Sequence, residues 1–368
     1  VRKPRPVLFV MDPRGRGVIG LEVFRATATR LGWIVLSSYE TASDDPKAPN
    51  VDATNAMLED AQGRWVADMR RLYFAGFSGT ARFAWDLAEQ LRGNVAGVLM
   101  AAAGITPGSA LAATVNGFEA LPALAVTAGT TDMNWSEVRS TETRFAIPAM
   151  TSRFWYFAGS HSWPPPSIAS DAIEWFESVA MRRGLAAPDS VWLSARRQRL
   201  SLRADSLQMA GAMEEALALY RELGSDADSV TARRARRSYD SLAATGTMKK
   251  YLERLAAAQR EEQEAIRIMS TALADFRSGA LNNDAPSVTK RLRIPQLQKD
   301  LTSSDSVRVL SSRRRLEHAM AILSFYEPRN LLAAGDTARA ITLLRVAAQI
   351  DSARAGREAR AFGFSRVP

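Results

Sequence analysis

The stretch Leu72–Arg82, which reads LYFAGFSGTAR, decides how the first half of the chain is interpreted. Its apolar start ends at the pentapeptide GFSGT (residues 76–80), and a helix-compatible segment, ARFAWDLAEQL, follows at once. One interpretation is a plain strand-to-helix turn, because glycines permit the tight backbone that such a turn needs. The other is a nucleophile elbow, in which a strained turn holds a serine hydroxyl out at the carboxyl edge of a sheet. The pentapeptide alone leaves both open.

Apolar runs and amphipathic segments alternate around this stretch. The runs expected to be strands are Val7–Met11, Trp33–Ser37, Leu72–Ala75, Val95–Ala101, Ala123–Ala128 and Arg153–Ala158. The segments expected to be helices are Val18–Leu31, Thr54–Arg70, Ala81–Leu91, Ser136–Ala146 and Ile168–Arg182. The runs are continuously apolar, as expected of parallel strands that are covered on both faces. The pattern therefore predicts an α/β fold with a six-stranded, mostly parallel sheet.

The pattern changes after Gly184, where strand-like runs stop and apolar residues recur at three- and four-residue spacing. The expected helices are Ser190–Met209, Ala212–Leu223, Ser229–Ala244, Met248–Ala274 and Ser306–Leu323. Two stretches, Ala212–Leu223 and Leu331–Ile350 with its Gly-Asp turn, resemble tetratricopeptide hairpins. We therefore expect two domains, an α/β domain over residues 1–184 and an all-helical, tetratricopeptide-like domain over residues 185–368.

Composition excludes several kinds of chemistry. The chain has no cysteine, so disulfides, thiolate metal sites and a cysteine nucleophile are excluded. It has only two histidines, His161 and His318, which argues against a metal site made of several imidazoles. We expect no metal and no cofactor. No apolar run is long enough to span a bilayer. The lack of cysteine and a first residue other than methionine favour a periplasmic or secreted location, although the compartment stays open.

A serine nucleophile needs a base, and the base needs a group that orients it. Ser78 would be the nucleophile. His161 follows the last expected strand, and it is the only histidine in the half that contains Ser78. Asp132 follows the preceding strand through a Gly-Thr-Thr turn. In a parallel sheet these positions lie at the same carboxyl edge. Each residue taken alone also fits a structural role, His161 in a surface loop and Asp132 as a turn or cap residue.

The oxyanion of a tetrahedral intermediate needs two hydrogen-bond donors. One expected donor is the backbone N–H that follows the nucleophile, at Gly79. The other should come from the loop after the first strand, where Arg14 and Gly15 are the candidates. Glycine in that loop would let the backbone approach a substrate closely.

With these parts in the chain order Ser, Asp, His, residues 4–184 resemble the α/β-hydrolase family. The resemblance is closest to the small carboxylesterase and depolymerase-like branch, through GFSGT and the segment SHSWPPP at residues 160–166. It implies a nucleophile at Ser78, a base at His161 and an acid at Asp132. The chain departs from the family pattern at Thr80, which stands where the elbow G-x-S-x-G ends in glycine. A β-branched residue there predicts a tilted or less strained turn.

Aromatic residues flank the three candidate catalytic residues. Phe77, Trp135 and Trp163 are expected either to form an apolar pocket for an acyl or aryl group or simply to pack beside the loops. No long insertion follows the third strand, so the α/β half itself carries no large cap. An ester of modest size is the expected substrate, and a thioester or an amide would use the same machinery.

The net charge of +9 arises entirely after residue 184, because residues 1–184 carry equal numbers of acidic and basic side chains. The arginine clusters are Arg196-Arg197, Arg233-Arg234 with Arg236-Arg237, and Arg313-Arg314-Arg315. Acidic residues are interleaved and no nucleic-acid motif is present, so nucleic-acid binding is not expected. A solvated face is the plainest interpretation, and an anionic membrane surface or an acidic partner is the next. Repeat-like helices also favour a protein partner or self-association.

Two classes of function stay open at this point. In the first, the chain is a serine esterase with a helical module that docks or shields it. In the second, the hydrolase half is a scaffold with weak or no turnover, and the protein acts through interactions. The complete set of Ser78, His161 and Asp132 favours the enzyme.

Overall fold

The computed structural model describes residues 3–43, 47–91, 93–105, 121–146, 151–225, 230–365 and 367. By its internal contacts the chain divides into two compact units. The first unit comprises Val1–Thr130 and Glu137–Lys250, and the second comprises Thr131–Ser136 and Tyr251–Pro368. This division falls later than residue 184, because three helices beyond that residue pack in the first unit. The boundary after Gly184 stays a prediction about how the sequence is organised.

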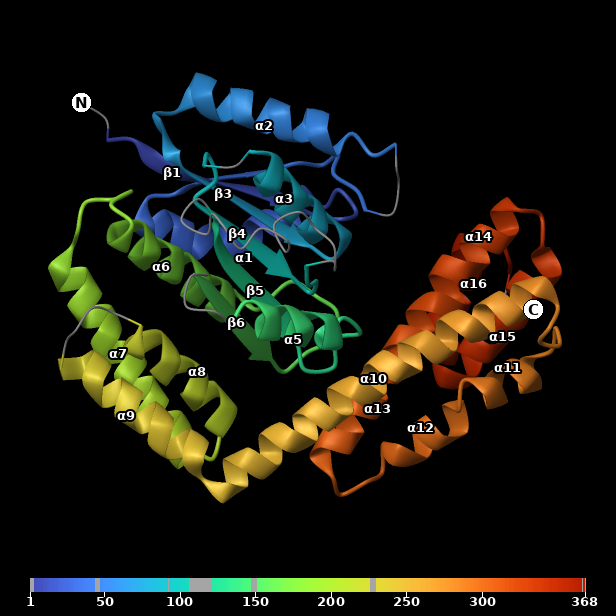
Figure 1. The fold of residues 1–368 in the computed structure, drawn as a ribbon. Helices are drawn as coiled ribbons and strands as arrows, with labels where there is room; N and C mark the ends of the chain where they lie inside the picture. Colours follow the sequence, from blue (N-terminus) through green and yellow to red (C-terminus); the bar gives the residue numbers. More distant parts are fainter. Residues whose placement is uncertain are drawn as a thin grey trace. The chain divides into compact units, whose positions relative to one another are not determined.

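The first unit is built on a six-stranded sheet in which every strand pairs in parallel with its neighbours (Figure 1). The strands are β1 (Arg5–Met11), β2 (Ile34–Ser37), β3 (Ala67–Phe77), β4 (Gly97–Ala101), β5 (Ala123–Gly129) and β6 (Ser152–Phe157). Their order across the sheet is β2-β1-β3-β4-β5-β6. All six predicted strands are present, and the predicted fold class, an α/β sheet with flanking helices followed by a helical region, is confirmed.

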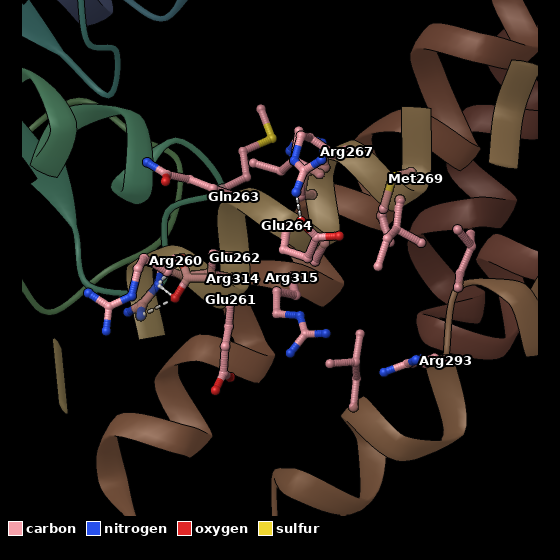
Figure 2. Close-up of a pocket in the computed structure, with 18 of the residues that line it drawn as sticks. Arg260, Glu261, Glu262, Gln263, Glu264, Arg267, Met269, Arg293, Arg314 and Arg315 are labelled. Carbon is pink, nitrogen blue, oxygen red and sulfur yellow. Dashed lines mark hydrogen bonds and ion pairs between the residues drawn. The ribbon is translucent and has the colours of Figure 1, made fainter. Parts of the chain in front are cut away.

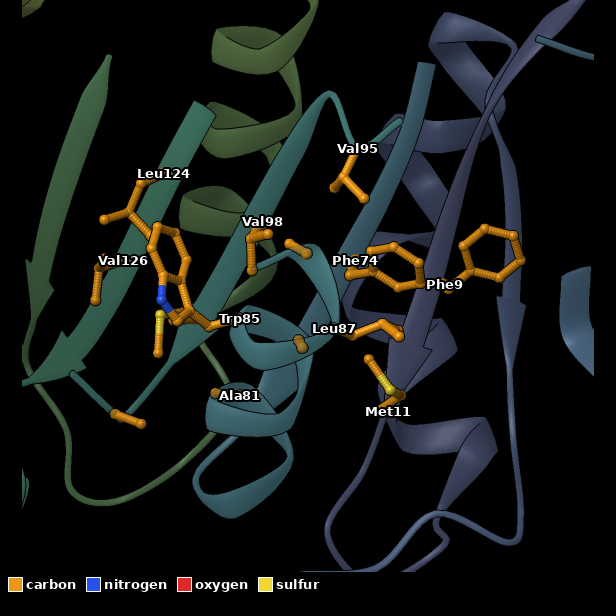
Figure 3. Packing of buried hydrophobic residues seen from close by; sticks show 14 of the residues in the cluster. Phe9, Met11, Phe74, Ala81, Trp85, Leu87, Val95, Val98, Leu124 and Val126 are labelled. Atoms are coloured by element: carbon orange, nitrogen blue, oxygen red, sulfur yellow. The ribbon is translucent and has the colours of Figure 1, made fainter. Parts of the chain in front are cut away.

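Helices cover both faces of this sheet. They are α1 (Gly17–Leu31), α2 (Asn50–Arg64), α3 (Gly79–Gln90), α5 (Trp135–Arg144) and α6 (Pro166–Arg182). Because side chains alternate along a strand, Phe9 points into one core and Leu8 into the other. Figure 3 shows the first core, where Phe9 stacks on Phe74 and Trp85 from α3 packs among strand residues. Burial on both faces explains why the strands are continuously apolar.

One predicted boundary is wrong. The helix expected over Thr54–Arg70 ends at Arg64, and strand β3 begins at Ala67. The first five residues of β3, ADMRR, mix polar and apolar side chains and are at least partly exposed, so their sequence carries no strand pattern. Ala67 nevertheless pairs with Arg5 of β1, ahead of an irregularity in the register. Pairing between distant segments therefore overrides the local helical pattern.

The first unit continues through three helices, α7 (Ser190–Met209), α8 (Met213–Gly224) and α9 (Val230–Ala244). Their predicted positions are confirmed, except that the expected start at Ser229 lies outside the described residues. Buried ion pairs connect α7 and α8 to the sheet. The Glu222 carboxylate of α8 accepts hydrogen bonds from Arg153 of β6 at 3.0 Å and from Arg196 of α7 at 2.6 Å. Arg196, from the first arginine cluster, therefore stabilises the packing of α7 against α8.

The second unit is helical. It contains most of α10 (Gly246–Ser278), then α11 (Ala285–Arg291), α12 (Ile294–Asp300), α13 (Ser306–Ala321), a π-helix (Ile322–Tyr326), α14 (Glu327–Ala333), α15 (Thr337–Ile350) and α16 (Ser352–Ala361). The hairpin predicted around the Gly-Asp turn is present as α14 and α15, and its tetratricopeptide character stays a prediction. The sequence analysis missed α11, α12 and α16, which are short. None of the helices in the described ranges combines the length and the apolar character that a bilayer crossing requires.

The Glu222 group predicts how stability depends on pH. Burial raises the pKa of Glu222, but Arg196 and Arg153 offset this and leave the pKa below its ordinary value. A carboxylate with a lowered folded-state pKa contributes stability above its unfolded pKa and loses it as the pH falls. We expect Glu222→Gln to lower the free energy of unfolding by about 3–5 kcal/mol at neutral pH, because two buried guanidinium groups lose their partner. The difference should shrink below pH ~4.5.

Urea unfolding at neutral and acidic pH, followed by circular dichroism, measures this difference. Glu22→Gln is the matched control, because Glu22 makes its ion pair with Arg25 at the surface. An exposed pair of this kind contributes at most about 1 kcal/mol. If both substitutions changed stability equally at neutral pH, the Glu222 group would have no special role in joining α7 and α8 to the sheet.

Candidate functional site

The turn between β3 and α3 holds Ser78 in an unusual backbone conformation. Ser78 has φ 56° and ψ −122°, a region that residues with a side chain rarely adopt. Its N–H donates to the Ala101 carbonyl of β4 at 2.8 Å. A Cβ at Gly76 would lie 2.2 Å from the Thr80 carbonyl oxygen, so only glycine allows the strand and the helix to approach this closely. This is the backbone of a strained strand-to-helix turn, as a nucleophile elbow requires.

Thr80 fastens this turn instead of relaxing it. Its hydroxyl donates to the Met11 carbonyl at the end of β1, 2.6 Å away. The same hydroxyl accepts the Phe77 N–H at 3.1 Å. The Thr80 side chain is fully buried. The missing glycine predicts a tilted or a less strained turn. The positive φ of Ser78 contradicts the less strained turn, and a tilt stays a prediction. The hydroxyl links the ends of β1 and β3 to the start of α3.

His161 lies within hydrogen-bond distance of Ser78. The loop after β6 places the histidine Nε2 2.9 Å from the serine Oγ. This separation is the one expected of a nucleophile and its general base. The Phe77 ring, next to Ser78 in the chain, packs against the imidazole at 4.8 Å between ring centroids. Two residues far apart in the sequence are thus brought together as predicted, and their catalytic roles stay a proposal.

A buried carboxylate that the sequence analysis missed holds the two loops beside this pair. Asp12, directly after β1, is fully buried and accepts the Trp163 indole N–H at 2.9 Å. The Arg16 guanidinium donates to both of its oxygens at 2.9 and 3.0 Å. Burial raises the pKa of Asp12, but the hydrogen bonds from Arg16 and Trp163 outweigh it and keep the pKa low. An acidic residue at the carboxyl end of an apolar strand was the signal available in the sequence.

The expected oxyanion donors lie where the sequence places them, but two of the three are already engaged. The Arg14 N–H donates to the Asp12 carboxylate at 2.9 Å, and the Gly15 N–H donates to the Asp12 carbonyl at 3.2 Å. Gly79 follows Ser78 directly as the first residue of α3. An oxyanion bound at Arg14 or Gly15 would have to compete with Asp12. The donor assignment stays a proposal.

Asp132 lies three residues beyond β5, the strand between β4 and β6. It is fully buried, and its Oδ1 accepts the Asn134 N–H at 2.8 Å. Its carbonyl accepts the Trp135 N–H at 3.0 Å. These bonds are those of a tight turn, which is the structural role that the sequence left open. Its role as the orienting acid stays a prediction.

The three aromatic residues expected at the substrate pocket are all buried. Phe77 and Trp163 pack together at 5.7 Å between ring centroids, and Phe24 meets the Trp163 ring edge-on. Trp135 lies under the Arg314 guanidinium, 3.8 Å from its ring centroid. Packing therefore accounts for these side chains, and a contact with substrate stays a prediction. The described residues hold no group of three histidine or acidic side chains arranged to bind a metal ion.

No protein-family model and no curated protein matches the chain. Solved structures with some likeness include esterase PE8, at 13% identity and a TM-score of 0.38, over 48% of this chain and 93% of that one. A structure from a study of two fungal esterases from Rhizomucor miehei matches at 13% identity and a TM-score of 0.39, and the match covers 50% of this chain and 76% of that one. Esterase LipW from Mycobacterium marinum matches at 18% identity and a TM-score of 0.38, and the match covers 49% of this chain and 74% of that one. TM-scores this low carry no argument about activity.

The backbone at residue 78 gives a prediction about stability. At an ordinary helical position alanine is more stable than glycine by about 0.5–1 kcal/mol. At Ser78 we expect the reverse, with Ser78→Gly more stable than Ser78→Ala by about 1 kcal/mol, because glycine adopts this conformation without strain. Urea unfolding of both variants measures the difference. The control is the same pair at Asp86, an exposed position within α3, where alanine should be the more stable.

The Thr80 hydroxyl gives a second prediction. We expect Thr80→Val, which keeps the shape of the side chain, to lower the free energy of unfolding by about 1–3 kcal/mol, because a buried N–H and a buried carbonyl lose their partner. Thr80→Ser keeps the hydroxyl and should lose only about 1 kcal/mol for the missing methyl group. Denaturant unfolding compares the two. A valine variant as stable as the parent would show that the hydroxyl does not fasten the turn.

Proposed function

We propose that the chain is a serine hydrolase that cleaves a carboxylic ester through an acyl-enzyme intermediate. The observation that carries the proposal is the 2.9 Å separation between Ser78 Oγ and His161 Nε2, with Ser78 held in a strained turn at the end of β3. A buried serine whose only requirement was packing would not need this backbone conformation.

The reaction starts as Ser78 Oγ attacks the ester carbonyl carbon and His161 Nε2 takes its proton. The bond to the alcohol then breaks, and the alcohol leaves with the proton from His161. Water, deprotonated by the same nitrogen, attacks the acyl carbon. The bond from that carbon to Ser78 Oγ breaks, His161 returns the proton to Oγ, and the acid is released. The Gly79 N–H, with Arg14 or Gly15, is the proposed donor set for the oxyanion. Asp132 is the proposed acid that orients His161 and stabilises its protonated form.

Neighbouring groups support His161 as the base. Phe77 packs on its ring, and Trp163, two residues later in the same loop, is anchored on Asp12. These contacts limit how far the loop after β6 can move from Ser78. An ester of modest size remains the proposed substrate, with Phe77, Trp135 and Trp163 proposed to surround its acyl group. The role of the helical region in docking a protein partner or in self-association stays a prediction.

A specific observation favours the second candidate, a scaffold with weak or no turnover. The Arg14 and Gly15 amides donate to Asp12, so a complete oxyanion hole requires the loop after β1 to exchange these bonds. Such an exchange would lower the rate, because oxyanion stabilisation depends on donors that are already in place. The two candidates therefore differ in whether turnover is measurable.

Labelling by a fluorophosphonate probe and turnover of p-nitrophenyl acetate and butyrate distinguish them. We expect the parent to be labelled and to hydrolyse both esters. Ser78→Ala should lose the label, and Ser78→Ala and His161→Gln should each lower kcat by roughly 10⁴-fold or more. Ser160→Ala, in the loop that carries His161, is the matched control and should behave like the parent. A folded parent that is neither labelled nor active would contradict the hydrolase proposal and support the scaffold.

A further inference from the structure

The second unit contains a cavity of about 650 Å³ that the proposed hydrolase does not use. It is lined by α10, by the segment that joins α11 to α12, and by α13 (Figure 2). Met133, from the loop after β5, also lines it. A volume of this size is typical of sites for small organic molecules. The cavity belongs to the second unit alone, so its interpretation does not depend on how the two units are arranged.

The three consecutive arginines of α13 have different environments. Arg313 is exposed and does not line the cavity. Arg314 is buried, lies over Trp135, and donates to both carboxylate oxygens of Glu262, at 2.6 Å and 3.0 Å. Its charge is therefore matched. Arg315 lines the cavity, and its Nε is buried with no hydrogen-bond partner.

Arg293 brings a second unmatched cation to the same cavity. It lies just before α12 in a left-handed conformation with φ 54°. Among the described residues, neither Arg293 nor Arg315 has a carboxylate within ion-pair distance. Figure 2 shows the two side chains extending toward the same space from opposite sides. Burial lowers the pKa of Arg315, and the charge of Arg293 lowers it further, although Glu261, Glu262 and Asp300 act in the opposite direction.

Arg293 is exposed and Arg315 is half-buried, and their like charges repel each other. The Nε of Arg315 is buried and has no hydrogen-bond partner among the described residues, which is unfavourable. A bound oxyanion would satisfy both arginines, since guanidinium groups bind carboxylate and phosphate with paired hydrogen bonds. His318 also lines the cavity, and burial lowers its pKa, so it offers a neutral imidazole. Arg293 and Arg315 therefore provide positive charge that an anionic group can match, and the Glu261 carboxylate, which also lines the cavity, offsets part of it.

Apolar side chains also line the cavity, beside the carboxylates of Glu261, Glu262 and Glu264 on α10. Met269 of α10, together with Leu292 and Leu297 on either side of Arg293, contributes buried aliphatic side chains to the lining. All three belong to the hydrophobic core of the second unit, so only the small part of each that faces the cavity is open to a ligand. A ligand with an anionic head and an apolar body would cover that surface, whereas a small inorganic anion would not.

We propose that this cavity is a binding site for an amphipathic organic anion, whose carboxylate or phosphate head is held by Arg293 and Arg315 and whose apolar chain lies against Met269, Leu292 and Leu297. The proposal concerns binding in the second unit and holds whether or not the first unit hydrolyses esters.

Isothermal titration calorimetry on the full chain tests this site. Decanoate and decyl phosphate, both kept below their micelle-forming concentrations, are the probes for the two kinds of head group. We expect saturable 1:1 binding of at least one of them, and the tighter one identifies the head. Inorganic phosphate, which lacks the chain, and decanol, which lacks the charge, should each bind at least about tenfold more weakly. Decyltrimethylammonium, with the same chain and the opposite charge, should not bind.

Substitutions connect the binding to the two arginines. We expect Arg315→Gln and Arg293→Gln each to weaken binding by about tenfold or more, because each removes a charge-assisted hydrogen bond. Arg313→Gln is the matched control from the same run and should bind like the parent. Thermal unfolding of each variant verifies that it is folded, and the two arginines provide independent tests if one variant is not.

Three outcomes would overturn the proposal. The first is that neither anionic probe binds at millimolar concentration. The second is equal binding of decyltrimethylammonium, which would indicate adsorption of the chain alone. The third is binding that folded Arg293→Gln and Arg315→Gln variants leave unchanged. All of these readouts measure binding, so a failure of the proposed hydrolase activity would be a separate result.

Discussion

The hydrogen bond from the Thr80 hydroxyl to the Met11 carbonyl is the constraint on which the candidate site depends. It joins the end of β1 to the first turn of α3, while the same hydroxyl accepts the Phe77 N–H. Ser78 lies between these fixed points and has to reverse the chain in one residue, which requires a positive φ. The strain at Ser78 persists because buried groups on both sides of it are already paired. The Thr80 side chain thus holds the helix start close to the strands through hydrogen bonds.

Asp12 extends this constraint to the loop that carries the proposed base. Its buried carboxylate binds the Arg16 guanidinium of the same loop and the Trp163 indole two residues beyond His161. Removing this carboxylate would take the partner from the buried Trp163 indole N–H and from the partly exposed Arg16 guanidinium, so the loops after β1 and β6 are held by one group. The same carboxylate also accepts a hydrogen bond from the Arg14 backbone N–H. Asp12 thus both anchors the loop of the proposed base and accepts the N–H of one donor proposed for the oxyanion, so the proposed reaction would depend on the balance between these two interactions.

The sequence predicted the sheet and the meeting of Ser78 with His161 because both follow from local pattern and from topology. Continuous apolar runs identify buried parallel strands, and parallel strands bring their carboxyl ends to one edge. It did not predict the start of β3 at Ala67, which depends on pairing with Arg5, a residue distant in the chain. Asp12 was missed for the same reason, since its role depends on Trp163, far along the sequence. Arg313, Arg314 and Arg315 are identical in the sequence and differ only in what the fold places beside them.

The loop after β5 belongs to a different packing unit from the strand that it follows. Residues Thr131–Ser136 follow a strand of the first unit, yet they cluster with the second. Trp135 packs under Arg314, and Met133 lines the cavity proposed to bind an anion. Along the chain, Asp132, the proposed acid, follows the end of β5 and directly precedes Met133. A chain that stopped at residue 184 would lack Arg314, which packs on Trp135 in the same loop as Asp132. The contact between Trp135 and Arg314 thus packs this loop against the helices of the second unit.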